Sequence, residues 1–201
     1  MSQGWKIATV LGLIVVAIGG PVAWHSIAAS IRSSVVIYND GQVFDCGEGE
    51  VQPSLYFDDV MQVPVIPLDP DLNCTLRFFI ENTSDTAVEI TDIILPSHGS
   101  GFMSTPLVVA IDQLEPIIDG DPEFVMDAVI HYDSALIIEP HEVYPLDVRL
   151  EYNPGVCMSP GTSASFNSGP VLLVSALGLA GAVQDRSLYG YQSTAESITG
   201  C

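Results

Sequence analysis

Strict alternation of apolar and polar side chains marks two segments of this chain as strands with one buried face. Residues 72–80 read LNCTLRFFI, so Leu72, Cys74, Leu76, Phe78 and Ile80 share one face, and Asn73, Thr75, Arg77 and Phe79 share the other. Residues 144–152 read YPLDVRLEY and alternate in the same way. This period of two predicts half-buried antiparallel strands. Pro145 further predicts that the second strand begins unpaired or at a sheet edge.

Shorter strands are predicted between turn signals along the rest of the chain. They are expected at residues 34–38, 55–57, 88–95, 108–111, 124–132, 136–138, 171–177 and 182–191. Residues 88–95 are expected to return antiparallel after the polar turn at residues 81–85. Beyond residue 33 no segment shows a helical period over three turns. Many short strands separated by turns predict a mainly β domain, an antiparallel β-sandwich over residues 33–201.

An uncharged stretch, residues 7–31, precedes these strands and predicts one N-terminal transmembrane helix. Trp5 and Lys6 stand before the most apolar part, and Trp24 and Arg32 lie toward its far end. At about 1.5 Å per residue, a helix from Trp5 to Trp24 is roughly 28 Å long, close to the roughly 30 Å hydrocarbon core of a bilayer. Tryptophan and basic side chains favour the membrane interface. These four residues are the expected interface anchors, and residues 7–31 are expected to contact lipid.

A cleaved secretory signal is the alternative interpretation of this segment. Residues 7–18 would form its short apolar core, and Ser26-Ile27-Ala28 would be an acceptable small-x-small cleavage site. Renewed apolar character after Pro21 favours retention, because a spanning helix needs about 20 residues. We therefore expect residues 1–32 to form a short cytoplasmic tail and the span. Residues 33–201 are then the extracytoplasmic domain of a single-pass plasma-membrane protein.

Charge and cysteine content narrow the classes of partner. The formal net charge is −20, and all 25 aspartates and glutamates lie from Asp40 onward. Such a domain repels phosphate backbones, so nucleic acid is excluded as a partner. The apolar content of 48% argues against a disordered acidic tail.

The four cysteines, all beyond the span in an oxidising setting, predict two disulfides. We favour Cys46–Cys74 with Cys157–Cys201, because each pair would tie neighbouring strand ends. The sequence leaves the other two pairings open.

Two blocks of the sequence resemble a known family. Residues 72–96, LNCTLRFFIENTSDTAVEITDIILP, resemble the B-to-C hairpin of bacterial immunoglobulin-like envelope domains. Residues 136–157, LIIEPHEVYPLDVRLEYNPGVC, resemble their E-to-F region. Such domains often follow a single N-terminal span in actinobacterial-type membrane proteins. The resemblance implies an immunoglobulin-like fold and a single-span topology, and it implies little about activity.

The residues that could carry catalysis do not form a convincing set. Lys6 is the only lysine, so a lysine nucleophile is missing from the exported domain. Residues 98–101 (HGSG) and 161–165 (GTSAS) are faint cues for a serine hydrolase. In hydrolases of that kind the histidine follows the serine, whereas His141 is the last histidine of this chain. We predict that the protein is not an enzyme and requires no cofactor.

Acidic turns make metal binding the alternative function. Asp119, Asp121 and Glu123 alternate in one turn, with Asp112, Glu115 and Asp127 nearby, and hard oxygen ligands of this kind suit Ca²⁺. Copper would need soft ligands, and the candidate pairs are His98 with Met103, Met126 with His131, and His141 with Met158. A solvated acidic surface explains the first group, and core methionines with loop histidines explain the second.

Taken together, these features favour a membrane-anchored accessory or assembly subunit. The tethered domain has no catalytic set, and small residues at Gly12, Gly19 and Gly20 would let the span pack closely on other helices. The expected partner is another membrane or envelope protein. An exported domain that binds calcium or copper is the alternative.

Overall fold

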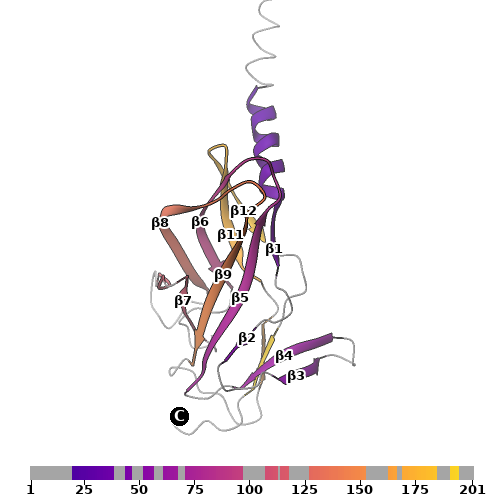
Figure 1. The fold of residues 1–201 in the computed structure, drawn as a ribbon, viewed down its shortest axis with the longest axis vertical. Coiled ribbons are helices and arrows are strands. Elements are labelled where there is room, and N and C mark those ends of the chain that lie inside the picture. Colours follow the sequence, from indigo (N-terminus) through magenta and orange to yellow (C-terminus); the bar gives the residue numbers. More distant parts are fainter. Residues whose placement is uncertain are drawn as a thin grey trace, which may run out of the picture.

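The computed structural model describes a helix and thirteen strands of this chain (Figure 1). The described residues are 20–38, 44–46, 52–56, 61–67, 71–96, 107–112, 114–117, 127–152, 163–166, 169–184 and 191–194. The helix is described over residues 20–33, and Figure 1 shows it in line with the long axis of the strands that follow. Among the described residues no helix is long and apolar enough to span a membrane. The first thirteen residues of the expected span, 7–19, lie outside the described part.

The strands form three sheets. The first has the order β1 (Val35–Tyr38), β5 (Asn73–Asn82), β9 (Val143–Glu151), β7 (Leu107–Ile111), with β2 (Phe44–Asp45) also paired to β5. The second has the order β12 (Leu179–Gln184), β11 (Val171–Ala176), β6 (Val88–Leu95), β8 (Ala128–Ile138). The third has the order β10 (Ser163–Phe166), β13 (Tyr191–Thr194), β4 (Met61–Pro67), β3 (Gln52–Tyr56). Every pairing in the first two sheets is antiparallel, and β13 with β4 is a parallel pair of the third.

The first two sheets pack face to face around one core. The alternation predicted in residues 72–80 is confirmed, because Cys74, Leu76, Phe78 and Ile80 are all fully buried. In β9 the same periodicity buries Leu146, Val148 and Leu150. These side chains join those of β6, β8 and β11 in a single hydrophobic cluster. One cluster shared by two antiparallel sheets makes this part of the chain a β-sandwich, as predicted.

Chain order and sheet order together define the topology. Strands β1, β5, β6, β7, β9, β11 and β12 follow one another in that order along the chain. If they are lettered A to G, the first sheet reads A-B-E-D and the second reads G-F-C. This is the strand arrangement of a constant-type immunoglobulin sandwich, with β8 added beside strand C.

Several predicted strands have the expected bounds but different neighbours. Residues 88–95 form β6 as predicted, yet β6 pairs with β8 and β11 and lies in the sheet opposite β5. The prediction that it returns beside the preceding strand is therefore wrong. Residues 128–138 form one strand rather than two, with a register shift opposite the stretch from Ile90 to Asp92. Of the strand predicted at residues 182–191, residues 182–184 belong to β12 and Tyr191 begins β13 in a different sheet, and residues 185–190 lie outside the described part.

One predicted disulfide is present. Cys46 and Cys74 are bonded, with a Cα–Cα distance of 4.1 Å, and they join the end of β2 to the adjacent strand β5. Cys157 and Cys201, the other favoured pair, lie outside the described residues.

Candidate protein-binding site

The outward face of the first sheet carries apolar side chains in two rows across three strands. Tyr38, Phe79 and Pro145 stand opposite one another on β1, β5 and β9. The rings of Tyr38 and Phe79 are stacked, with centroids 5.6 Å apart and an interplanar angle of 26°. The next row holds Val36, Glu81 and Val143. We call this face, Val36, Tyr38, Phe79, Val143 and Pro145 with Glu81 between the two valines, the docking face.

The docking face contains two exposed aliphatic side chains and two partly exposed rings. Val36 is 43% exposed and Val143 is 44% exposed, while Tyr38 and Phe79 are half-buried. They are exposed because they alternate with the core positions of the same strands, such as Ile37 and Phe78. Partly exposed aromatic rings beside exposed aliphatic groups are typical of protein interfaces, and here Glu81 adds one carboxylate between the two valines.

Beside the docking face, charged side chains are paired with one another. The Arg77 guanidinium binds the Asp147 carboxylate with two hydrogen bonds, of 2.5 and 2.8 Å. Those bonds and the charge of Arg77 lower the pKa of Asp147, and partial burial opposes them. Arg149 and Glu151 form a looser pair at 3.4 Å. In a chain of net charge −20 the charges of these four side chains cancel, and Glu81 adds one negative charge to the face.

A hollow of about 390 Å³ adjoins this face at the end of β7 and contains Asp112. Asp112 adopts a left-handed backbone conformation (φ 47°), and its carboxylate accepts three hydrogen bonds from the protein. The donors are the Tyr144 hydroxyl at 2.9 Å, the Tyr132 hydroxyl at 3.3 Å and the Asp147 backbone N–H at 3.2 Å. Burial raises the pKa of both tyrosines, with further contributions from Asp112, and that of Tyr144 reaches about 12. Both phenols are protonated near pH 7, as tyrosines ordinarily are, and donate hydrogen bonds to Asp112.

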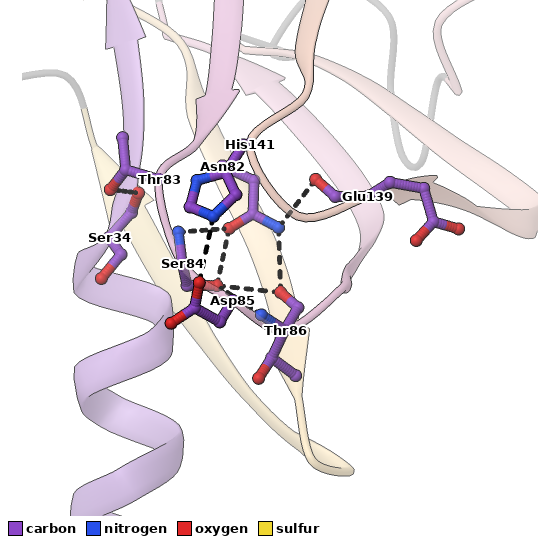
Figure 2. Close-up of polar contacts among 8 residues, drawn as sticks. All are labelled: Ser34, Asn82, Thr83, Ser84, Asp85, Thr86, Glu139 and His141. Carbon is purple, nitrogen blue, oxygen red and sulfur yellow. Dashed lines mark hydrogen bonds and ion pairs between the residues drawn. The ribbon is translucent and has the colours of Figure 1, made fainter.

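A second polar cluster lies at the end of the sandwich next to the helix (Figure 2). Among the described residues Asn82 is the only polar side chain that is fully buried. Its amide nitrogen donates to the carbonyl groups of Thr86 (2.9 Å), Ile138 (3.1 Å) and Glu139 (3.1 Å). Its amide oxygen accepts from the Ser84 N–H (3.1 Å) and hydroxyl (2.8 Å). Asn82 therefore joins the connection between β5 and β6 to the connection between β8 and β9. Each of these connections runs from one sheet of the sandwich to the other.

The helix is fixed to this same end of the sandwich. The carbonyl group of Ser34 accepts from the backbone N–H (3.0 Å) and the hydroxyl (2.8 Å) of Thr83. The Arg32 guanidinium donates to the carbonyl group of Leu179 at 2.8 Å, and Ala28 is fully buried. Ser34 alone separates the helix from β1, so the chain has no flexible linker there.

The predicted interface anchors and metal ligands fall partly outside the described residues. Trp5 and Lys6 do so, whereas Trp24 lies on the helix and is 49% exposed, and Arg32 contacts the β11–β12 hairpin. The turn with Asp119, Asp121 and Glu123 also lies outside. Within the described ranges no group of three or more His, Cys, Asp or Glu side chains could hold a metal ion.

The other chemical candidates do not come together where they are described. Asp112 is held by two tyrosines, His131 pairs with Asp92 at 2.8 Å, and His141 pairs with Asp85 at 3.0 Å. Burial alone would raise the pKa of Asp92, but the hydrogen bonds from His131 and Thr91, together with the charge interaction with His131, lower it. The remaining copper candidates, His98, Met103, Met126 and Met158, lie outside the described residues.

One of the two hydrolase cues can be placed in the structure. Residues 163–166, which overlap the second cue, form β10, a strand paired with β13. Residues 98–101 lie outside the described part.

Sequence reasoning did not identify Asn82 or the docking face. Asn82 stood in a stretch interpreted only as a polar turn, and one sequence gives no sign that its amide is buried. Phe79 did carry a signal, because a large aromatic residue stood on the polar face of residues 72–80.

Comparison with known proteins identifies no family. No family model matches the chain, and no curated protein matches it. One similar solved structure is the ASH/PapD-like domain of human CEP192 (PapD-like domain 7), which is 11% identical with a TM-score of 0.34, over 83% of this chain and 87% of that chain. Another is the Pseudomonas fluorescens alkylpurine DNA glycosylase AlkC bound to DNA containing an abasic site analog, 10% identical with a TM-score of 0.33, over 82% of this chain and 31% of that chain. Likenesses this weak say nothing about activity or partner.

Proposed function

We propose that this chain is a non-enzymatic, single-pass membrane protein whose sandwich stands outside the membrane and binds another membrane or envelope protein. The observation that carries the proposal is the docking face, an exposed aromatic and aliphatic surface on an otherwise strongly acidic domain.

Anchoring is supported by the sequence before the sandwich and by its junction with the sandwich. Residues 7–31 are uncharged, with Trp5 and Lys6 before them and Arg32 after. The helix that continues from this stretch is bonded to the sandwich through Arg32 and Ser34. A span joined this way would hold the domain in a fixed orientation above the bilayer, with the N-terminus in the cytoplasm.

Export of the domain is supported by the Cys46–Cys74 disulfide, because such bonds persist in oxidising compartments. The order A-B-E-D and G-F-C supports the finer assignment to the immunoglobulin-like domains of cell envelopes. An actinobacterial-type source stays part of this proposal.

A different protein fits the docking face better than a second copy of this chain. Two copies would each carry a net charge of −20 and repel one another at low salt. A partner with an apolar patch and a weakly acidic or basic surround meets no such repulsion. The docking face also begins two residues after Ser34, on β1, so the partner would lie beside the anchor and close to the membrane.

The test is copurification of the full chain from gently solubilised membranes. Val143→Asp places a charge in the docking face at a position that is already exposed. Ile137→Asp is the matched control, because Ile137 is 55% exposed on the opposite sheet. We expect wild type and Ile137→Asp to retain a stoichiometric partner and Val143→Asp to lose most of it. A monomer without a partner in all three preparations would refute the proposal.

A further inference from the structure

A hollow of about 860 Å³ lies on the open side of the sandwich, between the edge strand β1 of the first sheet and the edge strand β12 of the second. Its lining residues are Ala29, Arg32, Ser33, Val35, Val36, Ile37, Tyr38, Val171, Ala182, Val183 and Gln184. Of these, Arg32 is the only charged residue. We call this hollow the seam groove.

The hairpin of β11 and β12 shows which backbone groups point into the open side. Leu177 and Gly178 both have positive φ, 52° and 76°, which defines a two-residue type I′ turn. Such a turn is closed by the hydrogen-bonded pair Ala176–Leu179, and hydrogen-bonded pairs then recur at every second residue. The backbone N–H and C=O groups of Ala180, Ala182 and Gln184 therefore point away from β11. Among the described strands none pairs with β12 on that side.

The two strands that border the seam groove lack charges, prolines and register shifts, which are common means of protecting sheet edges. β1 reads VVIY and β12 reads LAGAVQ, with no charge, no proline and no register shift in either pairing. The opposite edges differ: β8 carries His131 and Asp133, and both β7 and β8 have irregular registers. Charges and bulges are the common means of blocking strand addition at an edge. Their absence at β1 and β12 marks the seam groove as the side that accepts a strand.

The core is also less well covered along β12 than along its neighbour β11. Leu172 and Val174 on β11 are fully buried, whereas Val183 on the core side of β12 is only half-buried. A further strand beside β12 would cover Val183 and would lie over Val35 and Ile37 across the groove. Strand addition of this kind uses main-chain hydrogen bonds for affinity and alternate side chains for specificity.

We propose that an extended, mainly apolar segment of the partner protein adds to β12 and fills the seam groove, with a carboxylate near Arg32. Arg32 is the one charged side chain among the described residues that line the groove, and its guanidinium lies over Gly181, where an added Cβ would meet Nε at 2.7 Å. The groove also shares Val36 and Tyr38 with the docking face, so one partner can occupy both. This inference rests on the proposed function, because the strand comes from the same partner.

The test uses the full chain in its native membranes with the photoreactive residue benzoylphenylalanine at Ala182 or at Gln184. The same probe at Val143 reports partner contact at the docking face. At Ile137 it serves as the control, because Ile137 lies on β8, the opposite edge strand of the second sheet. We expect the probes at Ala182 and Gln184 to cross-link one short segment of the partner, at positions about two residues apart. Ala182→Lys should reduce the yield from Gln184 at least tenfold, because a lysine blocks an edge, while circular dichroism stays that of wild type.

Each other outcome counts against a defined part of the account. Cross-links from Val143 with none from Ala182 or Gln184 would overturn strand addition and leave the proposed function standing. Cross-links to a second copy of this chain, or to scattered positions of the partner, would overturn it as well. If the probes at Val143, Ala182 and Gln184 all gave no cross-link to a partner protein, the result would count against the proposed function itself.

Discussion

Replacing Asn82 by alanine should cost the sandwich about 3–4 kcal/mol. The two N–H bonds of its amide serve three carbonyl groups, and its oxygen accepts two further hydrogen bonds, all around a fully buried side chain. Each such hydrogen bond contributes about 1 kcal/mol net, and a buried carbonyl group left without a donor costs about 1–3 kcal/mol. Only the bond to the Ile138 carbonyl group is buried, so about 2 kcal/mol for that group and roughly 1–2 kcal/mol for the part-buried bonds, which water can replace, give about 3–4 kcal/mol.

The change is measured by urea unfolding of the detergent-extracted full chain, followed by circular dichroism. The Asn82→Ala midpoint should fall with the slope unchanged, because the variant alters stability and not the surface exposed. For a protein of this size, 3–4 kcal/mol corresponds to a melting temperature lower by roughly 6–16 °C. Asp85→Ala is the matched control in the same turn, since Asp85 is 97% exposed and pairs only with an exposed histidine.

The control should change stability by less than about 0.5 kcal/mol. If Asn82→Ala were no less stable than Asp85→Ala, the argument that Asn82 locks the two connections together would be wrong. Partner binding through the docking face does not test this argument, because Asn82 lies at the end of the sandwich beside the helix.

Three further predictions concern the disulfide, the tyrosines and metal. Replacing Cys46 and Cys74 together by serine should cost about 3.5 kcal/mol, because the bond closes a loop with a sequence separation of 28, and urea midpoints that match the wild type would contradict this. The wild type should lose stability as pH rises from about 10 toward 12, because the Tyr144 phenol ionises at lower pH in the unfolded chain than in the folded one. The urea midpoint should fall less steeply with pH in Tyr144→Phe. An equal fall with pH in both proteins would refute the role given to this hydroxyl. Chelation with EDTA should leave the melting temperature unchanged, and a rise on adding back calcium or copper would instead favour the metal-binding alternative.

The sequence predicted individual strands better than it predicted their neighbours. Alternation gave the buried face of β5, because side chains in a strand point to opposite faces in turn, and turn signals gave the bounds of β6. Alternation carries no information about partners, so β6 was expected beside β5 and lies in the other sheet. β4 was missed because its sequence MQVPVIP contains two prolines, which argue against a paired strand.

The candidate site was less accessible to sequence reasoning than the fold. The docking face depends on the register of β1, β5 and β9, which places Tyr38, Phe79 and Pro145 in one row. That register brings together residues far apart in the chain, and local pattern does not specify it. The role of Asn82 likewise depends on carbonyl groups of a distant connection, at Ile138 and Glu139.

The most direct test of the central claim is photo-cross-linking from the middle of the docking face in intact membranes. Benzoylphenylalanine at Phe79 replaces one aromatic side chain by another, and the same residue at Ile137 is the control on the opposite sheet. The account predicts one dominant cross-linked membrane or envelope protein from Phe79 and none from Ile137. Equal cross-linking from both positions, or none from Phe79, would contradict it.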